Sequence, residues 1–533
     1  MIATRTPACT RARARTRASG SFAARLIWPL VMLTLVGSAV AAPPQNNAGG
    51  VRESLGPLFN PDFTRAGPAQ HARRHWAMSE TAVRRWNDVA IDTSGIDHTP
   101  VAPGETRIFG EQLGPGRAAR AMAIVHIAVF DAVNAIAGGY QGYTRLPRVS
   151  EATAMEAAVA QAAHDTLVAL FPSQTASLDA LLAEDLGRMR LLRPAPKAAG
   201  IDLGRRAAAA ILALRADDGS QHAEPRMGTD YVPGTQPGQW RQDPVSKIPL
   251  AMGAHWGTVK PFVLSSGQQF RLPAPPAMGS AEYTAAFEEV KRLGGDGITT
   301  PTVRTEQEKQ LAIFWAYDGT PSLCAPPRLY NQIAAQIAEQ KRSNVVELAR
   351  LLALVNVAMA DAGIAAWDSK YHHGLWRPVT GVREADPGTG PSGAGDGNTS
   401  TLADATFMPL GAPASNLNGP NFTPPFPSYP SGHATFGGAL FQTLRLFYGT
   451  DRIPFTFVSD EFNGVTRDNQ GQVRLLTPRH FTTLSQAETE NGRSRIYLGI
   501  HWAFDSTQGI AQGQRVADHV LDNAFEPLEH KRR

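Results

Sequence analysis

The chain of 533 residues is 43% hydrophobic and 18% charged, which is typical of a globular protein and argues against a disordered or fibrous one. Its formal net charge is +4, but six arginines and no acidic residue precede residue 42. The remainder therefore has 45 basic and 47 acidic residues, a balance that gives no support to nucleic-acid binding.

The first 41 residues have the pattern of an export signal. The six arginines precede an apolar run, Leu26–Val36, and the small residues Ala39-Val40-Ala41 then form a cleavage motif. We expect a Sec-type signal peptide over residues 1–41 and a periplasmic or secreted mature chain. A retained membrane anchor is the alternative, but the run is shorter than the ~20 residues that a span needs. No later stretch is expected to cross a membrane.

Apolar residues recur at helical spacing along most of the chain, and strand signals are few. The sequence therefore predicts an all-α fold of helical bundles with long irregular connecting loops. The predicted helices cover residues 117–136, 151–170, 175–192, 201–214, 280–293, 305–317, 327–340, 345–376, 431–447 and 487–523. Proline- and glycine-rich stretches separate them, above all over residues 216–280 and 385–425.

Three regions follow from this pattern. We predict an irregular N-terminal arm over residues 42–105, an N-terminal helical domain with a wrapping connector over 106–280, and a C-terminal catalytic helical-bundle domain over 281–533. Cys9 lies in the expected signal, so Cys324 is left without a partner for an intramolecular disulfide. The stability of the mature chain then depends on core packing.

The first candidates for chemistry are two cations, Lys370 and Arg377. They are seven residues apart, which places both on one face of a helix that Pro378 is expected to end. Two like charges on one face repel unless an anion lies between them or carboxylates neutralise them. For this pair alone, a solvated basic face is the simpler interpretation.

The second candidate is the segment Pro430-Ser431-Gly432-His433, which precedes the apolar run from Ala434 to Phe447. Proline suits the first position of a helix, Ser431 offers a hydroxyl, and Gly432 lets a ligand approach its backbone N–H. The N-terminus of a helix binds anions, and His433 is placed to exchange a proton with the bound group. An ordinary helix start is the alternative.

The third candidate holds Ser494-Arg495, His501 and Asp505. Ser494 and His501 are seven residues apart and are predicted to share a helix face. His501 and Asp505 are four apart, so Asp505 can accept a hydrogen bond from one imidazole nitrogen. That bond fixes the tautomer and leaves the other nitrogen available as a nucleophile or ligand. On its own, such a pair is more often a surface contact.

Together the three segments supply up to three positive charges, several uncharged donors and two histidines. This set predicts a pocket for a tetrahedral or trigonal-bipyramidal oxyanion that needs no bridging metal cation. The order Lys-x6-Arg-Pro, Pro-Ser-Gly-His, Ser-Arg-x5-His-x3-Asp resembles the superfamily shared by vanadium-dependent haloperoxidases and type 2 phosphatidic acid phosphatases, which includes bacterial acid phosphatases.

Several further segments resemble the chloroperoxidase-like branch of the vanadium haloperoxidases. They are Pro424–Tyr429, Ala316–Gly319, Pro326–Arg328, Tyr330–Gln332, His255–Thr258 and the helix Met122–Ile136. Trp367 and Phe426 match the aromatic wall of the chloride-oxidising type, so the resemblance favours chloride as the halide, with bromide as the alternative. The resemblance also implies two packed helical bundles, with the pocket between helices of the second.

By this resemblance, His501 is the axial vanadium ligand, Asp505 orients it, and His433 is the acid–base partner of the apical oxygen. Asp318 is expected to contact the cationic cluster at Arg495. The residues expected to bind the vanadate oxygens are Lys370, Arg377, Ser431, Gly432 and Arg495. Lys370 would also polarise bound peroxide.

The resemblance implies an enzyme that oxidises halide with hydrogen peroxide to hypohalous acid, which then halogenates a small organic acceptor. Vanadate is the expected cofactor, and phosphate is a competing oxyanion. The alternative is an acid phosphatase in which His501 forms a phosphohistidine. Soluble acid phosphatases of this superfamily are much shorter, and its lipid phosphatases carry several membrane spans, which favours the haloperoxidase. A non-catalytic oxyanion-binding protein would not need both histidines intact.

Overall fold

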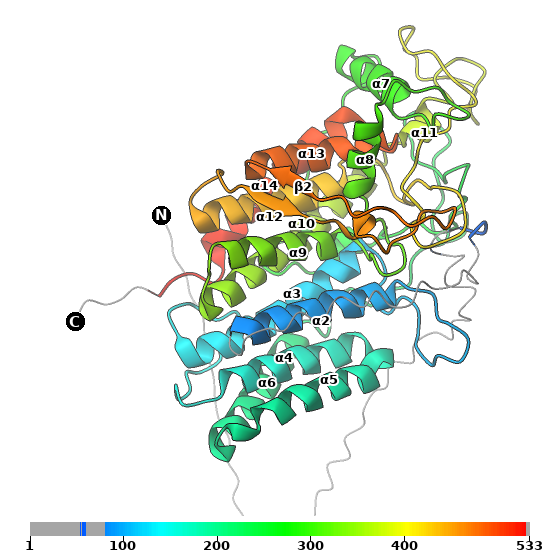
Figure 1. Ribbon diagram of the computed structural model, residues 1–533. Helices are drawn as coiled ribbons and strands as arrows, with labels where there is room; N and C mark the ends of the chain where they lie inside the picture. The colour runs from blue at the N-terminus through cyan, green and yellow to red at the C-terminus, as the bar shows by residue number, and fades with distance from the viewer. Residues whose placement is uncertain (1–53, 55, 60–79, 529–533) are drawn as a thin grey trace, which may run out of the picture. The chain divides into compact units, whose positions relative to one another are not determined.

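The computed structural model describes residues 54, 56–59 and 80–528, all of which belong to one compact unit. Over these residues the fold is built from α-helices, long loops and one two-stranded sheet (Figure 1). The predicted all-α fold with long irregular loops is therefore confirmed. The expected signal peptide over residues 1–41 lies outside the described residues.

Five helices from the first half of the chain form one bundle (Figure 1). They are α2 (Glu80–Asp97), α3 (Pro115–Ala137), α4 (Met155–Leu170), α5 (Thr175–Arg188) and α6 (Pro194–Leu214). The backbones of α4 and α6 come into close contact at Gly204, where a Cβ would lie 2.5 Å from the Ala158 carbonyl oxygen. Small residues at this contact let the alanine-rich faces of the two helices bury one another.

The helices of the second half form another bundle around the longest helix, α10. Its members are α9 (Pro326–Gln340), α10 (Val345–His373), α12 (Gly432–Tyr448), α13 (Leu484–Tyr497) and α14 (Ala503–Asn523), flanked by α7 (Ala281–Leu293), α8 (Glu306–Phe314), α11 (Pro378–Gly381) and the antiparallel strands β1 (Phe455–Phe457) and β2 (Arg479–Phe481). A Cβ at Gly509 of α14 would lie 2.8 Å from the Ser431 carbonyl oxygen. This close contact holds the start of α12 against α14.

The two bundles share one hydrophobic core, in which α10 lies against α3. Among the described helices, these two are long and apolar enough to cross a membrane, so the expectation that no later stretch has that character is wrong. Their most apolar windows are 100% and 94% buried within the protein. A helix surrounded by other helices needs no polar face, which accounts for this composition.

The irregular arm expected over residues 42–105 contains an 18-residue helix, α2. Its apolar residues Val83, Trp86 and Ala90 recur at helical spacing and are buried. The pattern is weak because asparagine, aspartate, threonine and glycine, all poor helix formers, stand among them. Packing of α2 against α4 and α9 provides the stability that its low helix propensity does not.

Helix ends account for the other differences from the prediction. The single helix expected over residues 487–523 is two helices, α13 and α14, separated at Gly499, which has a φ of +73°. A glycine in this left-handed conformation ends a helix. Helix α6 begins at Pro194 rather than near residue 201, because proline is tolerated in the first helical turn.

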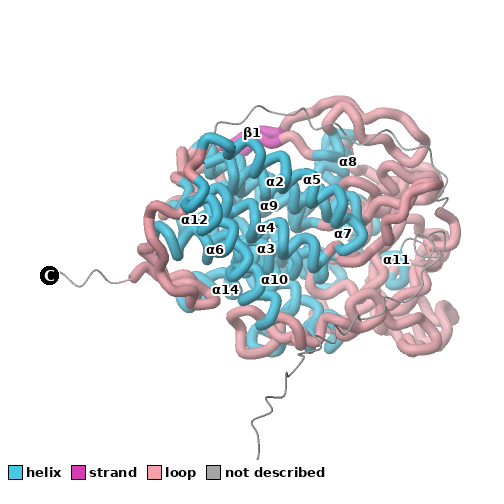
Figure 2. Tube along the Cα trace, turned by 90° about the horizontal axis from the view of Figure 1, so that it is seen from below, coloured by secondary structure: helices cyan, strands magenta, loops and turns pink. Residues whose placement is uncertain are grey.

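Long loops gather at one side of the helices (Figure 2). The connector between α6 and α7 is irregular apart from the 3-10 helices η3 (Trp256–Thr258) and η4 (Gly267–Phe270). It is fixed to α10 by Asp361, whose carboxylate accepts three consecutive backbone N–H groups, those of residues 262–264, at 2.6, 2.7 and 2.9 Å. The remaining 3-10 helices are η1 (Pro172–Gln174), η2 (Met189–Leu191) and η5 (Asp460–Phe462).

Candidate active site

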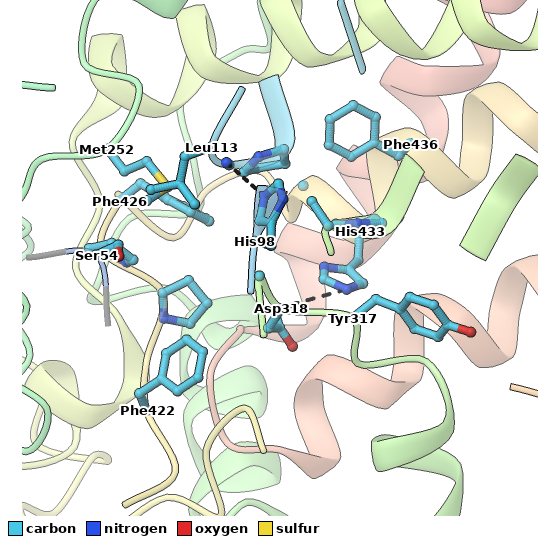
Figure 3. A pocket seen from close by; sticks show the side chains of 18 of the residues that line it. Ser54, His98, Leu113, Met252, Tyr317, Asp318, Phe422, Phe426, His433 and Phe436 are labelled. Atoms are coloured by element: carbon cyan, nitrogen blue, oxygen red, sulfur yellow. Dashed lines mark hydrogen bonds and ion pairs between the residues drawn. The ribbon is translucent and has the colours of Figure 1, made fainter. Parts of the chain in front are cut away.

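A pocket of about 640 Å³, its open mouth included, lies where helix ends meet the loops (Figure 3). The predicted site residues that line it are Asp318, Trp367, Phe426, Gly432, His433, Arg495 and His501. The other four, Lys370, Arg377, Ser431 and Asp505, lie directly behind that wall. The structure therefore brings all the predicted site residues together.

Lys370 and Arg377 reach the pocket from different elements, so the prediction that they share one helix face is wrong. Helix α10 ends at His373, and Gly374 then takes the left-handed conformation with φ 58°. The chain turns back at this glycine and places Arg377 directly before α11. The two cations converge because the helix stops between them.

The Lys370 ammonium group is fully buried. It donates to the carbonyl oxygens of Pro427, Ser428 and Pro430 at 2.9, 3.1 and 2.5 Å. Burial, together with the nearby Arg377, holds its pKa well below the ordinary lysine value. Lys370 therefore fixes the segment that leads into α12 and places a positive charge behind the pocket.

Arg377 is 1% exposed and joins three parts of the site. Its Nε donates to the Phe426 carbonyl oxygen at 2.9 Å. Its Nη1 donates to the Ile500 carbonyl oxygen at 2.8 Å and to Nε2 of His501 at 2.9 Å. Its Nη2 is buried without a hydrogen-bond partner. Burial lowers the pKa of this guanidinium to about 9, which reflects the cost of a buried and incompletely paired cation.

The predicted bond between His501 and Asp505 is present. Nδ1 of His501 donates to Asp505 Oδ2 at 2.7 Å, and the same carboxylate accepts the Trp502 N–H at 3.0 Å and the Ser428 hydroxyl. With Nδ1 protonated, Nε2 is the acceptor for Arg377, as its distance requires. Burial and Arg377 hold the pKa of His501 well below its ordinary value, so the ring is neutral and Nε2 carries the lone pair, which accepts from Arg377 in this structure.

His501 itself lies in the turn between α13 and α14, not on a helix, so the predicted shared face with Ser494 is wrong. Ser494 lies within α13, and its hydroxyl donates to the Asn491 carbonyl oxygen at 2.7 Å. Ser494 therefore provides a hydrogen-bond donor to a backbone carbonyl group of α13. The break after Gly499 is what turns His501 towards the pocket.

The predicted contact between Asp318 and Arg495 is also present. Nη2 of Arg495 donates to both carboxylate oxygens of Asp318, at 2.7 and 2.9 Å. Both side chains are buried, and burial raises the pKa of the Asp318 carboxyl. Nε and Nη1 of Arg495 are buried without a partner. Asp318 thus holds one edge of this guanidinium and leaves its other donors open.

Helix α12 begins at Gly432, with Ser431 as its N-cap, so Pro430 does not occupy the first helical position as predicted. The Ser431 hydroxyl oxygen accepts the Ala434 N–H at 3.4 Å. The N–H groups of Gly432 and His433, at the first two helical positions, have no acceptor within the helix. A Cβ at Gly432 would lie 3.2 Å from the Trp367 ring, so only glycine fits here without displacing that ring.

His433 lies beside Asp318, with Nε2 4.0 Å from Oδ1 (dashed line in Figure 3). Its Nε2 also contacts the carbonyl oxygen of Ala316, to which an N–H on this nitrogen donates. Tyr317, the residue between these two partners, has a φ of +46°, a strained conformation for a side chain of this size. This turn lets one short segment present both the carbonyl and the carboxylate to His433. Burial and Arg495 hold the pKa of His433 well below its ordinary value.

The pocket therefore has an excess of buried hydrogen-bond donors. Next to the start of α12, three guanidinium nitrogens of Arg377 and Arg495 have no acceptor among the residues that the structure describes. Buried donors are normally paired, so this set fits a bound anion with several oxygen atoms. Among the described residues, no group of three or more His, Cys, Asp or Glu side chains could hold a metal cation. Vanadate suits this donor set, since it needs one nitrogen ligand and many hydrogen-bond donors.

Residues from the N-terminal half complete the pocket, although no sequence pattern predicts them there. His98 follows α2, Leu113 and Gly114 precede α3, and Met252 belongs to the connector. Trp367 Nε1 donates to the Met252 carbonyl oxygen at 3.1 Å. Nothing local distinguishes these residues, because only tertiary contacts bring them to the site. The predicted aromatic wall is present, with the Trp367 and Phe426 rings 4.9 Å apart.

Comparison with known proteins agrees with this geometry. Residues 350–530 match the family described as the VCPO second helical-bundle domain. The chain is 31% identical to vanadium chloroperoxidase from Curvularia inaequalis over 503 residues, which covers 79% of this chain and 78% of that protein. A shorter match, 30% identical over 110 residues, covers 19% of this chain and 18% of the vanadium-dependent bromoperoxidase from Ascophyllum nodosum.

Solved structures show the same fold. A bacterial vanadium-dependent iodoperoxidase superposes with a TM-score of 0.66 at 23% identity, covering 86% of this chain and 99% of the other. A bacterial vanadium-dependent chloroperoxidase superposes with a TM-score of 0.56 at 18% identity, covering 79% and 95%. The sequence match over most of both chains, together with the shared fold, shows that this chain belongs to the vanadium haloperoxidase family, whose members are oxidoreductases.

Proposed function

We propose that this enzyme oxidises halide with hydrogen peroxide to hypohalous acid, using vanadate held on His501. Membership of the family supports the class of reaction. The observation that carries the assignment to this pocket is the set of unpaired guanidinium donors of Arg377 and Arg495 beside a neutral His501. A pocket built in this way is incomplete until an oxyanion fills it.

Each residue then has a definite task. Nε2 of His501 holds vanadium, because Asp505 keeps the proton on Nδ1. Donation to the vanadate oxygens is assigned to Arg377, Arg495, Ser431 and the Gly432 N–H. Lys370, whose three N–H groups donate to backbone carbonyl oxygens, supplies positive charge from behind the pocket. Bound vanadate would supply the Lewis-acid chemistry that activates hydrogen peroxide.

His433 is the proton carrier in this proposal. With an N–H on Nε2 directed to the Ala316 carbonyl, its Nδ1 lone pair is left to accept a proton from incoming hydrogen peroxide. The lowered pKa favours the neutral ring, which is the form that can act as a base. Arg495 donates to both oxygens of Asp318, and its charge partly offsets the rise that burial causes in the pKa of that carboxyl.

The Trp367 and Phe426 rings form an apolar wall in front of Lys370, whose Nζ lies 5.4 and 5.0 Å from the two ring centres. A weakly hydrated halide fits such a wall better than a strongly hydrated anion. We propose chloride and bromide as substrates and a small organic molecule as halogen acceptor. Export by the Sec-type signal to the periplasm or medium remains part of the proposal.

The test is a halogenation assay on residues 42–533 with orthovanadate, hydrogen peroxide and chloride or bromide, followed with monochlorodimedone. We expect vanadate-dependent turnover that phosphate inhibits and that His501→Ala abolishes. Absence of halide turnover, together with phosphate-ester hydrolysis that vanadate inhibits, would contradict the proposal. The protein would then be an acid phosphatase with His501 as its nucleophile.

A further inference from the structure

One sulfur atom stands in the wall of a pocket that generates an oxidant. Among the described residues that line the pocket, only Met252 contains sulfur, and Cys324 is buried outside the lining. A Cβ at Gly114, which also lines the pocket, would lie 3.0 Å from Sδ of Met252. This places the thioether at the pocket wall, where Figure 3 shows it with Leu113 and Phe426.

The backbone of Met252 is tied to the site on both sides. Its N–H donates to the Pro425 carbonyl oxygen at 2.9 Å. Its own carbonyl oxygen accepts Nε1 of Trp367 at 3.1 Å and the Tyr371 hydroxyl at 2.8 Å. These bonds fix the Met252 backbone beside Trp367, one of the aromatic residues that face the proposed halide site.

A thioether is soft and polarisable and is oxidised readily to the sulfoxide. We propose that Met252 is a site of self-modification, at which hypohalous acid formed in the pocket oxidises the side chain during turnover. This inference rests on the proposed function, which supplies the oxidant.

The step balances without another reagent. The sulfur lone pair attacks the halogen, the oxygen–halogen bond breaks, and hydroxide leaves. Water then forms the sulfur–oxygen bond as halide departs, and the net result is one sulfoxide, one halide ion and one proton. Sulfur loses two electrons and the halogen gains them. The product places a polar oxygen against an apolar wall, so activity falls as the modification accumulates.

The exposure of the methionine side chains distinguishes oxidation from within the pocket from oxidation by an oxidant in bulk solvent. Met252 is 9% exposed and lies in the hydrophobic core. Five other methionines are half-buried and therefore more accessible from outside: Met155, Met189, Met227, Met278 and Met408. An oxidant that arrives from bulk solvent reaches these five first, whereas one formed in the pocket reaches Met252 first.

The experiment follows methionine sulfoxide by peptide mass spectrometry during bromide turnover of the vanadate-loaded enzyme, with free methionine added to trap escaping oxidant. We expect the Met252 sulfoxide to form ahead of the five surface sulfoxides. Hypobromous acid added from outside to the enzyme without peroxide should reverse this order. Met252→Leu, which is similar in volume, should lose activity several-fold more slowly, relative to its own initial rate.

Oxidation of Met252 no earlier than the five, or equally fast with peroxide but no halide, would overturn the inference while halide turnover still supported the proposed function. Absence of halide turnover would overturn both.

Discussion

Two buried arginines, Arg377 in the pocket and Arg328 in α9, show the difference between a binding site and a structural ion pair. Arg328 is 3% exposed, and its guanidinium donates to Asp460 at 2.8 Å and Asp92 at 2.9 Å. Burial lowers its pKa, but the two carboxylates outweigh that effect and hold the pKa above its ordinary value. Arg377 is as deeply buried, but no carboxylate of the described part of the chain lies at hydrogen-bond distance from it, and burial lowers its pKa to about 9.

Burial alone therefore does not identify a functional cation. In both places the protein has taken a guanidinium out of water, at a large cost in hydration energy. Around Arg328, ion pairs with carboxylates offset this loss of hydration. Around Arg377, hydrogen bonds to carbonyl oxygens and His501 offset only part of it, and one donor is left open. An anion from solution completes the second arrangement but has no place in the first.

Replacement of Arg377, which has an unpaired donor, should have the largest effect on turnover. We expect Arg377→Met to lower halide turnover about 10²–10³-fold, because a donor to the developing charge is lost from a buried site. The free energy of unfolding should change by less than about 1 kcal/mol, since an incompletely paired buried cation contributes little net stability. Steady-state halogenation and urea unfolding measure the two effects. A large loss of stability with turnover retained would contradict the comparison.

Replacement of Arg328, the paired cation, should instead lower stability and leave vanadate binding unchanged. We expect Arg328→Met to lower the free energy of unfolding by about 3 kcal/mol, because Asp460, whose side chain is only 14% exposed, loses its ion-pair partner. The affinity of the folded protein for vanadate should be unchanged. Urea unfolding and vanadate titration on the same preparation test this. Weakened vanadate binding in a stably folded Arg328→Met would show that the two arginines are not independent.

A matched pair of carboxylates sharpens the contrast. Asp505 positions His501, whereas Asp361 accepts three backbone N–H groups of the connector. We expect Asp505→Asn to lower vanadate affinity about 10–100-fold, because the amide no longer favours the correct tautomer. Asp361→Asn should lower stability and leave the affinity of the folded protein intact. Equal losses of affinity in the two variants would argue against a specific role for Asp505.

The smallest effect concerns a charged group in the N-terminal bundle. His164 bonds Asp165 and Asp179, both at 2.8 Å; burial lowers its pKa, but these bonds outweigh burial and raise it above 6.5. The native state thus binds the proton more tightly than the unfolded chain. Its contribution of about 1 kcal/mol is present below pH 6.5 and is lost as the pH rises through the raised pKa. His164→Gln should therefore be less stable than wild type at low pH only. A pH-independent difference in thermal unfolding would contradict this.

Most helices could be predicted from the sequence, because their apolar residues recur at helical spacing. Their ends were harder to predict. Gly374 and Gly499 both take the left-handed conformation and end helices, but a glycine within an apolar stretch is also compatible with a continuous helix. The pairing of Lys370 with Arg377 was therefore predicted correctly for the wrong reason. A turn, not a shared face, brings them together.

The site was predicted from three motifs that lie within about 135 residues of sequence, whereas part of its wall comes from far outside them. His98 and Met252 line the pocket from the first half of the chain. Neither stands in a distinctive pattern, and their positions depend on contacts with α3 and α10 that no local property encodes. Chemistry-bearing residues can be found by type and spacing, but the apolar wall that shapes the pocket requires the fold.

The most direct test of the account is the binding of orthovanadate to the mature chain, measured by equilibrium dialysis with wild type, Arg377→Met, Arg328→Met and His501→Ala. We expect one bound vanadate per chain in wild type and Arg328→Met, displaced by phosphate, and strongly weakened binding in the other two variants. Unchanged binding in Arg377→Met and His501→Ala would contradict it, because the oxyanion would then lie somewhere other than this pocket.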